Sequence, residues 1–386
     1  MFIRKTARLY PTKDQESFLN QNLGNQRFLW NHLVQKNRER YEQEKKFIFY
    51  HESSRLLKTL KETYEFLSIG LSQPLQQTLR DLEQSIKMCY KKKLGFPNFK
   101  KKSSGGSFRI PQGCKIVEGK LFIPKLKSGL KLKGKNIPED FNSITIKKES
   151  SGKWFVSFVV SFVEPEKVCI KSSVGIDLNS KYLVVLNNGY ALENLKYLKE
   201  KERRLKRYQR ILARKVKGSN QRKKARIKLS SFHEKIRNQQ KNFVEQLTTN
   251  IAKTYDHIVL EDLNVKGMQQ FNGRMILMAP FGLLRNKLTW KANKFGKSLT
   301  IINRFAPTSK VCSSCGQELN LTLKDRFIQC GCGLKIHRDH NAAINIHRLG
   351  TSQINACGDT PKPIGFVNSL DWVSLKQETS KSSVSM

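Results

Sequence analysis

The sequence predicts an α/β protein with more than one domain, on three observations. Short β-branched runs at 174–178, 182–186 and 258–260 are separated by long stretches with helical periodicity. Two cysteine pairs near residue 320 predict a small zinc ribbon set inside this α/β region. The first 170 residues begin and end with strand-like segments that enclose helical ones, which predicts a β-barrel carrying a helical insertion.

The N-terminal segment begins with a strand and continues with helices. Residues 2–9 alternate apolar and basic side chains, and Thr12 with Gln15 has the spacing of a helix capping box. Apolar residues then recur at helical spacing on both sides of Gly24, which predicts two helices separated by that glycine. A third helix follows Pro74. We expect Phe28 and Trp30 to lie in the helical core, although such rings can also stack on bases.

Strands return after this insertion. Residues 120–123, 143–148 and 153–163 are rich in β-branched and aromatic side chains, and with 2–9 they predict a small closed barrel. We therefore assign residues 1–12 and 106–170 to the barrel and 13–105 to the helical insertion. A run of three lysines precedes the strands and is either a solvated surface or a phosphate contact. We favour the phosphate contact for Lys100, Lys101 and Lys102.

Two carboxylates follow buried strands in the central part of the chain. Asp177 lies at the exit of the run 174–178, and the second run, 182–186, ends at an Asn-Asn-Gly turn, which predicts a hairpin. Glu261 ends the buried run 258–260. Each carboxylate alone is most simply a solvated turn residue. A carboxylate that ends a buried strand, however, needs a partner or a metal ion.

The region between these carboxylates is the most basic part of the chain. Residues 201–241 contain seventeen Lys and Arg against two Glu, and apolar positions at helical spacing predict a helical hairpin over 196–252. This charge density exceeds what solubility requires, so we predict that the hairpin binds nucleic-acid phosphates. The candidate contacts are Arg203, Arg204, Arg207, Arg210, Arg214, Lys223, Lys224 and Arg226.

The cysteine pairs are Cys312 with Cys315 and Cys330 with Cys332, separated by fourteen residues. Four thiolates can surround one Zn²⁺ tetrahedrally, so residues 307–335 predict a structural zinc ribbon. The second pair is C-x-C, one residue shorter than usual. His337 and His340 are therefore alternative ligands, and four reduced, unligated thiols are the remaining alternative.

A third carboxylate, Asp339, opens the helical run after the ribbon. Asp177, Glu261 and Asp339 lie on separate elements, each at a strand end or a helix start. Three such carboxylates suit two hard divalent cations, Mg²⁺ or alternatively Mn²⁺, placed for in-line phosphodiester cleavage. The α/β domain then comprises residues 171–306 and 336–350. We expect 265–278 to form a mobile lid and 351–386 a disordered tail.

Charge limits the class of partner. The 386-residue chain has 72 basic and 31 acidic residues and a net charge of +41, which favours a long nucleic-acid surface. A membrane surface is the alternative, but no apolar run approaches the roughly 20 residues of a spanning helix. We expect a cytoplasmic, prokaryotic protein that is nucleoid-associated on DNA. Cys89, Cys114, Cys169 and Cys357 are scattered, which argues against a disulfide framework.

Several segments resemble one known family. GIDLN, IVLEDLNVKGM, FAPTSKVCSSCG and HRDHNAAINI resemble, in this order, the RuvC-type nuclease motifs and zinc ribbon of the TnpB family of transposon-encoded, RNA-guided nucleases. The N-terminal RKTARLYPTKDQ and NQRFLWNHLV resemble the family's helical segment, so the likeness covers essentially the whole chain. The chain departs from the family pattern at Asn179, at the C-x-C pair and at His337, where Asp is common.

The resemblance implies an RNase H-like (RuvC) nuclease domain and a wedge domain at the barrel. It implies that Asp177, Glu261 and Asp339 are the catalytic carboxylates and that the four ribbon cysteines bind zinc. It also implies a monomer on a guide RNA that cleaves double-stranded DNA, with the guide–target heteroduplex on the basic hairpin. The alternatives are an RNA-guided DNA-binding regulator without cleavage, and a strand-transfer transposase. Arg338 is expected to approach the scissile phosphate or to form a structural salt bridge.

Overall fold

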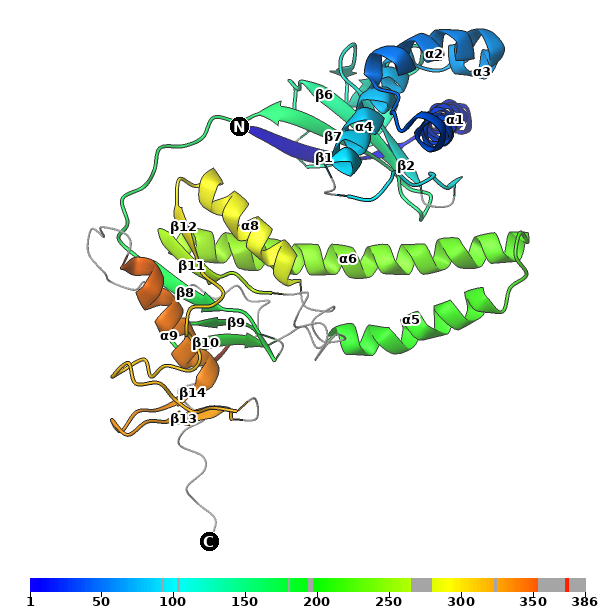
Figure 1. The fold of residues 1–386 in the computed structure, drawn as a ribbon. Helices are drawn as coiled ribbons and strands as arrows, with labels where there is room; N and C mark the ends of the chain where they lie inside the picture. Colours follow the sequence, from blue (N-terminus) through cyan, green and yellow to red (C-terminus); the bar gives the residue numbers. More distant parts are fainter. Residues whose placement is uncertain are drawn as a thin grey trace. The chain divides into compact units, whose positions relative to one another are not determined.

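The computed structural model describes residues 1–91, 94–102, 105–135, 137–179, 181–193, 197–264, 280–322, 325–352 and 372–374. The chain divides into two compact units (Figure 1). The first contains Met1–Val163 and Val216–Ser231, and the second contains Glu164–Lys215 and Phe232–Met386. The proposed lid, 265–278, lies outside the described residues.

The first unit contains a seven-stranded antiparallel sheet in the order β2-β6-β7-β1-β5-β4-β3. The strands predicted at 2–9, 120–123, 143–148 and 153–163 are confirmed, whereas β2, β3 and β5 were not predicted. The bounds are β1 Phe2–Tyr10, β2 Gly106–Ile110, β3 Lys115–Val117, β4 Lys120–Phe122, β5 Leu130–Lys133, β6 Ser143–Lys148 and β7 Trp154–Ser161.

The predicted closed barrel is not what these strands form. The order has two ends, β2 and β3, so the ladders of the described strands leave an open sheet. Strand β3 pairs with β4, and among the described strands no ladder joins β3 to β2. Period-two alternation still builds the core, because Trp154, Val156 and Phe158 of β7 point into one cluster with Leu9.

Four helices follow β1 in the first unit: α1 Lys13–Glu44, α2 Tyr50–Thr63, α3 Glu65–Ile69 and α4 Ser72–Tyr90. The capping box of Thr12 and Gln15 is confirmed at the start of α1. The predicted break at Gly24 is wrong, because α1 continues through it. A helical glycine costs about 1 kcal/mol, and α1 buries Leu19, Leu29 and Leu33 on either side, which outweighs that cost.

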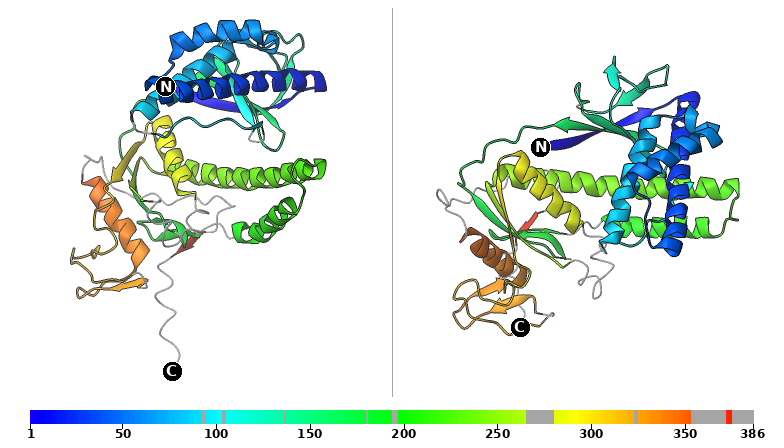
Figure 2. Two further views of the ribbon diagram at one scale, coloured as in Figure 1. Left: turned by 45° about the vertical axis from the view of Figure 1, so that its right-hand side comes forward. Right: turned by 45° about the horizontal axis from the view of Figure 1, so that its top comes forward.

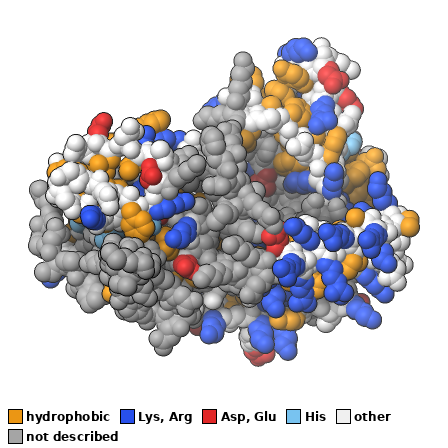
Figure 3. Space-filling view, turned by 90° about the horizontal axis from the view of Figure 1, so that it is seen from below, with side chains coloured by type: hydrophobic (Ala, Val, Ile, Leu, Met, Phe, Trp, Pro, Cys, Tyr) orange, Lys and Arg blue, Asp and Glu red, His pale blue; other side chains and the backbone are white. Residues whose placement is uncertain are grey.

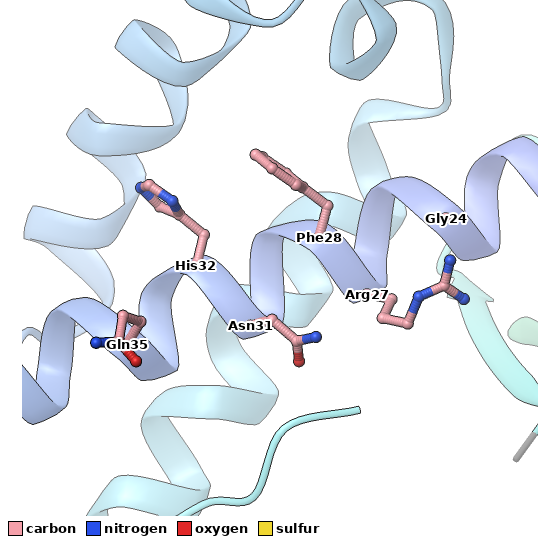
Figure 4. A pocket seen from close by; sticks show the side chains of 6 residues that line it. All are labelled: Gly24, Arg27, Phe28, Asn31, His32 and Gln35. Carbon is pink, nitrogen blue, oxygen red and sulfur yellow. The ribbon is translucent and has the colours of Figure 1, made fainter. Parts of the chain in front are cut away.

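One face of α1 lines a cavity of about 520 Å³. Figure 4 shows Phe28 and His32 pointing to one side of the helix and Asn31 to the other. The lining residues are Gly24, Arg27, Phe28, Asn31, His32 and Gln35. Phe28 packs edge-on against Tyr64 and Phe66, and Trp30 is buried, so both aromatic residues belong to the helical core as predicted.

The second unit contains a six-stranded sheet in the order β12-β11-β8-β9-β10-β15. Strand β11 is parallel to both β8 and β12, whereas β9, β10 and β15 continue the sheet in antiparallel pairs. The predicted hairpin, β8 with β9, and the predicted strand at 258–260, β11, are confirmed, whereas β10 and β15 were not predicted. The bounds are β8 Ser173–Asp177, β9 Tyr182–Leu186, β10 Tyr190–Glu193, β11 His257–Glu261, β12 Ser298–Ile302 and β15 Trp372–Ser374.

Helices cover both faces of this sheet (Figure 2). Val174, Ile176 and Leu260 pack with residues of α6 (Asn220–Thr254) and α8 (Phe281–Lys294) in the main core. Ala343 and Ile346 of α9 (Arg338–Thr351) pack on the opposite face. Alternation along β8 and β11 therefore directs Asp177 and Glu261 toward the face that carries α9.

The predicted basic hairpin is α5 (Tyr197–Ala213) with α6, and the ribbon carries a two-stranded hairpin, β13 (Phe327–Gln329) and β14 (Lys335–His337). The predicted disordered tail needs correction at 372–374, which form β15 on the edge strand β10. The other tail residues from 353 lie outside the described residues. Within the described helices, none is long and apolar enough to cross a membrane.

Candidate metal centre

Asp177 and Glu261 are brought to one edge of the sheet by strand pairing. Leu260 of β11 is the parallel partner of Ile176 of β8, so each carboxylate is the next residue along its strand. The carboxyl ends of parallel strands meet at the same edge, where side chains from neighbouring strands can act together.

The third carboxylate reaches this edge because α9 crosses β8 unusually closely. A Cβ atom on Gly175 would lie 2.5 Å from both the Cβ atom and the backbone nitrogen of His347, so only glycine fits there. Asp177 lies two residues beyond Gly175 on the strand. Asp339 lies one helical turn before Ala343, whose carbonyl also faces Gly175. The same crossing therefore places Asp339 near Asp177.

The environment of Asp177 disfavours its charged form. Burial, and then the nearby negative charges of Asp339 and Glu261, raise the pKa of Asp177 to about 7. Asn179 opposes this by donating from Nδ2 to Asp177 Oδ2 at 3.1 Å. Its Oδ1 accepts bonds from the backbone of Lys181 and Tyr182, so Asn179 fixes both the turn and the carboxylate. This is one of the positions at which the chain departs from the family pattern.

Asp339 lies in the first turn of α9, and His337 caps that helix. Nδ1 of His337 accepts a bond from the Asp339 backbone nitrogen at 3.2 Å, which is the role that Asp, Ser or Thr usually fills. His337 therefore supplies the capping acceptor that an aspartate offers in much of the family. Asp339 Oδ2 is buried and has no hydrogen-bond partner in the described structure.

Glu261 is held from the segment that follows β12. Thr308 Oγ1 lies 3.4 Å from Glu261 Oε2 and donates to it. Burial raises the pKa of Glu261, with a further contribution from the charge of Asp262 and partial relief from Thr308. Thr308 was not predicted as a site residue, and its position in FAPTSK gave no chemical signal on its own.

The carboxylates suit hard divalent cations. Two carboxylates have raised pKa values, and a buried oxygen of the third has no hydrogen-bond partner among the described residues. Mg²⁺ prefers such carboxylate oxygens. Among the described residues, the three do not form a cluster as tight as that of the cysteines. The set therefore fits ions shared between carboxylates better than a single ion held by all three.

The four cysteines do converge. Sγ atoms of Cys312 and Cys332 lie 3.7 Å apart, those of Cys315 and Cys330 lie 3.5 Å apart, and all four lie within 4.8 Å of one another. This spacing suits one tetrahedral Zn²⁺. The short C-x-C pair therefore contributes the sulfur atoms of both Cys330 and Cys332 to this cluster. The alternative ligands are engaged elsewhere, because His337 caps α9 and His340 Nε2 lies 3.0 Å from the Asn187 carbonyl.

Two asparagines of α9 fasten the ribbon to the sheet domain. Asn341 accepts from the Ser313 backbone and donates to the Val311 carbonyl at 2.7 Å. Asn345 donates to the carbonyls of Thr308 and Val311, both at 2.8 Å. The i, i+4 spacing of the two asparagines in NAAIN can be read from the sequence, but the carbonyl groups that they bind could not be predicted from it. The helix that carries Asp339 therefore also positions the zinc site.

Arg338 does not lie free beside the carboxylates. Its guanidinium donates to the Thr322 carbonyl at 2.7 Å, and its backbone nitrogen donates to the Arg326 carbonyl. These bonds attach α9 to the ribbon through backbone carbonyls, and they are not the salt bridge that was the expected structural alternative.

The predicted phosphate contacts on the basic hairpin are exposed. Figure 3 shows Lys and Arg side chains gathered over α5. Arg203, Arg207 and Arg210 follow one face of α5 at intervals of four and three residues. The exposed candidates are Arg203, Arg204, Arg207 and Arg210 of α5, Arg214 just after it, and Lys223, Lys224 and Arg226 of α6.

The three lysines at 100–102 do not all have the same contacts. Lys100 is strapped to α1: Asn31 bonds its backbone nitrogen at 2.7 Å and its carbonyl at 3.1 Å, and its ammonium lies 3.6 Å from the Trp30 ring centroid. Burial against this ring lowers the pKa of Lys100. Lys101 and Lys102 are exposed. The structure therefore holds Lys100 against α1, but Lys100 is exposed like the other two, and all three stay available to phosphate.

Family models match most of the chain. A family described as "Probable transposase" matches residues 151–272, and a model described as "Cas12f1-like, TNB domain" matches 281–346. A "Helix-turn-helix domain" model matches 1–46, although these residues form one strand and a single continuous helix. The second model covers α8, β12, the ribbon and the start of α9.

Similar curated proteins cover nearly the whole chain. A protein of Streptomyces pristinaespiralis named "Putative RNA-guided DNA endonuclease" is 32% identical over 382 residues, which is 96% of this chain and 94% of that protein. The InsQ protein of Escherichia coli (strain K12), with the same description, is 30% identical over 379 residues, covering 91% and 92%. TnpB-like protein L79 of Acanthamoeba polyphaga mimivirus is 27% identical over 34% of this chain.

A solved structure shares the fold. The cryo-EM structure titled as the Cas12f1–sgRNA–target DNA complex matches with a TM-score of 0.56 and 17% identity, covering 87% of this chain and 83% of that one. The family models and the curated relatives place the chain in a class of transposase-like proteins. Within it, the chain belongs to the TnpB family.

Proposed function

We propose that this protein is an RNA-guided DNA endonuclease of a mobile element. The observation that carries the proposal is the convergence of Asp177, Glu261 and Asp339 on one edge of the sheet, where burial and the charges of the other two carboxylates raise the pKa of Asp177. The names of its relatives support the guided reaction, because two of them span nearly the whole of both chains.

The sheet supports an RNase H-like (RuvC) fold for the nuclease domain. Three consecutive antiparallel strands, β8 to β10, are joined on the β8 side by the parallel strands β11 and β12, with helices on both faces. In this assignment the first strand, the fourth strand and the last helix each supply one carboxylate. This matches the order of the motifs in which the chain resembles its family.

Each carboxylate has its own local support. Asn179 orients Asp177, Thr308 holds one oxygen of Glu261, and the cap of α9 fixes the backbone of Asp339. Two Mg²⁺ ions bound here would activate water and stabilise the departing 3′ oxygen of a phosphodiester. The chain's residues would bind these ions in fixed positions and shield the site from bulk water, since Asp177 is buried.

The four cysteines would hold one structural Zn²⁺, and Asn341 and Asn345 would transmit that order to α9. The partners are an RNA guide and a double-stranded DNA target. The charge of +41 and the exposed cations of α5 support a long polyanion, and the heteroduplex is our proposed occupant of the hairpin. We expect a monomer on its RNA.

The test is to express the chain with its flanking mobile-element DNA, purify the complex and sequence the co-purified RNA. The complex is then incubated with Mg²⁺ and plasmids that carry guide-matched targets beside randomised flanks. We expect linear product that depends on the guide match, falls at least 1,000-fold in Asp177→Asn, Glu261→Gln and Asp339→Asn, and persists in Asp140→Asn, a matched loss of an exposed carboxylate.

The other outcomes identify the alternatives. Tight guided binding without cleavage in the unmodified chain would make the protein a regulator. Joining of transposon-end DNA without RNA would make it a strand-transfer transposase. Equal cleavage by the Asp177→Asn and Asp140→Asn variants would remove the carboxylates from the mechanism.

A further inference from the structure

Two arginines converge on the residue that follows Glu261. Asp262 accepts from the Arg285 guanidinium of α8 through Oδ1 and from the Arg304 guanidinium, just after β12, through Oδ2. Nε of Arg304 lies 3.1 Å from the same Oδ2. The bonds to Arg304 and Arg285 hold the pKa of Asp262 below its usual range. One negative charge therefore orients two positive ones, and the group carries a net positive charge beside the carboxylate edge.

These guanidiniums are not used up by Asp262. Each has five N–H donors, and the described structure pairs only one or two donors of each, all with Asp262. Arg285 and Arg304 keep 40% and 42% of their side-chain surface exposed. If the three side chains served only to stabilise the fold, the remaining N–H groups of the arginines could be covered by other parts of the protein. Here they face outward and can meet a second anion, and guanidinium geometry suits a phosphate.

An aromatic residue, Phe305, directly follows Arg304 in the chain. Phe305 is 86% exposed, although phenylalanine normally buries its ring. Its backbone is fixed, because its nitrogen donates to Asn303 Oδ1 at 3.0 Å and Ala306 closes a turn onto the Asn303 carbonyl. A rigid turn that presents an unpacked ring next to an arginine is a feature without structural benefit. It is, however, what stacking on an unpaired base requires.

We propose that Arg285, Arg304 and Phe305 form a subsite for one unpaired nucleotide of a single DNA strand, with the arginines on its phosphate and the ring on its base. Strand alternation directs Glu261 and Asp262 to opposite faces, so the subsite takes a nucleotide flanking the bond to be cut rather than the scissile phosphate itself. Asp262 is the positioning residue of the pair. The assignment of this nucleotide to a cleavage substrate rests on the proposed function.

The first test detects contact without requiring cleavage. The purified full chain is mixed, in magnesium-free buffer, with an oligodeoxythymidine 20-mer that carries 5-iododeoxyuridine, and is irradiated to crosslink the base to aromatic rings. Trypsin cleaves after Arg304 and Lys310, so a crosslink at Phe305 appears in peptide 305–310 by mass spectrometry. We expect this peptide to be a major product. We expect its yield to fall about tenfold in Arg285→Gln/Arg304→Gln, where the corresponding peptide is longer.

A matched control removes two other exposed cations. Arg55→Gln/Lys58→Gln lowers the net charge equally and should leave the crosslink at Phe305 unchanged. A crosslink spread evenly over the chain's aromatic residues, or one insensitive to the arginine pair, would overturn the subsite. A protein with this much positive charge attracts many anions without a specific site. Identifying the crosslinked residue is therefore needed to distinguish binding at the subsite from nonspecific electrostatic binding.

The second test uses the guided reaction. Phe305→Leu keeps apolar volume but removes the ring. It should raise KM for target DNA about tenfold and change kcat less than twofold, and Phe305→Tyr should restore the wild-type KM. Guided cleavage that is indifferent to Phe305→Leu would refute the subsite while leaving the nuclease intact. A crosslink at Phe305 without any guided cleavage would refute the proposed function while retaining the subsite.

Discussion

A Cβ atom on Gly175 of β8 would lie 2.5 Å from the backbone nitrogen of His347 on α9, so the strand and the helix are in direct backbone contact there. The contact is reinforced beside it, where Ser173 Oγ lies 2.6 Å from His347 Nε2. A second close approach occurs at Gly350 of α9, which faces Val259 of β11 with no room for a side chain. These close approaches fix the height of α9 above the strands, and hence the position of Asp339.

Gly175→Ala should therefore disrupt the site by moving α9, and with it Asp339, away from β8, while all three carboxylates remain in the chain. The added methyl group must push α9 away from β8, which we expect to cost about 2 kcal/mol of stability and to lower cleavage at least 100-fold. Guided DNA binding should change little. Gly24→Ala is the matched control, because that position has nothing within 4 Å and lies inside a helix. The control should be stabilised by about 1 kcal/mol. Equal cleavage by both variants would contradict this placement of Asp339.

Asp177→Asn should stabilise the magnesium-free protein at high pH. The folded pKa is about 7, above the usual value of 3.8, so the stability linked to this group is fully present below pH 4 and is lost as pH rises through 7. Removing the buried charge should therefore raise the free energy of unfolding at pH 8 by up to about 4 kcal/mol, and by much less at pH 5. Urea unfolding of both proteins at the two pH values measures this. A gain that is equal at both would show that Asp177 is not protonated in the fold.

Zinc content tests the ribbon. The wild-type chain should contain one zinc per molecule by inductively coupled plasma mass spectrometry. Cys332→Ser should lose it, because the C-x-C pair supplies two of the four sulfurs. Cys89→Ser is the matched cysteine control and should retain the metal. His340→Ala should also retain zinc, since its ring bonds the Asn187 carbonyl, and zinc loss in that variant would reinstate His340 as a ligand.

His337 acts as a helix cap, and this role can be separated from metal chemistry. His337→Ala removes the acceptor for the Asp339 backbone nitrogen and should cost about 1 kcal/mol of stability, while zinc is retained. His337→Asp restores a capping acceptor and should recover that stability. Thermal unfolding of the three proteins makes the comparison. A His337→Asp variant no more stable than His337→Ala would show that the ring packs rather than caps.

The exposed face of α5 should set the salt dependence of nucleic-acid binding. Replacing Arg207 and Arg210 by Gln should reduce the slope of log K against log salt by about 0.7–0.9 per lost phosphate contact. Arg55→Gln/Lys58→Gln carries the same loss of charge on α2. An equal change of slope in both pairs would mean that the hairpin contributes only to the overall charge.

Much of the nuclease-like domain could be predicted because its signals are local. The strands at 174–178 and 258–260 are buried apolar runs, and each ends at a carboxylate. The cysteine spacing required no knowledge of the fold. The contribution of Gly175 could not be predicted, because its importance depends on a helix more than 160 residues later in the chain. The role of Asp262 could not be predicted either, because the sequence does not show that Arg285 and Arg304 lie beside it.

The errors have a common cause, which is that tertiary packing outweighed local preference. Gly24 suggested a break, but α1 is held by core residues on both sides of it. The strands β2, β3 and β5 have only three to five residues, which is too few to show a clear alternating pattern. The closed barrel was inferred from strand count alone, although closure depends on which strands pair at the edges.

The strand β15 has a consequence for handling the protein. It pairs with β10, which would otherwise leave a row of unsatisfied backbone groups at the end of the sheet. Truncating the chain after α9 would uncover that row and invite self-association between copies. A purification tag or fusion partner is therefore better joined beyond residue 374 than in place of the segment that contains β15.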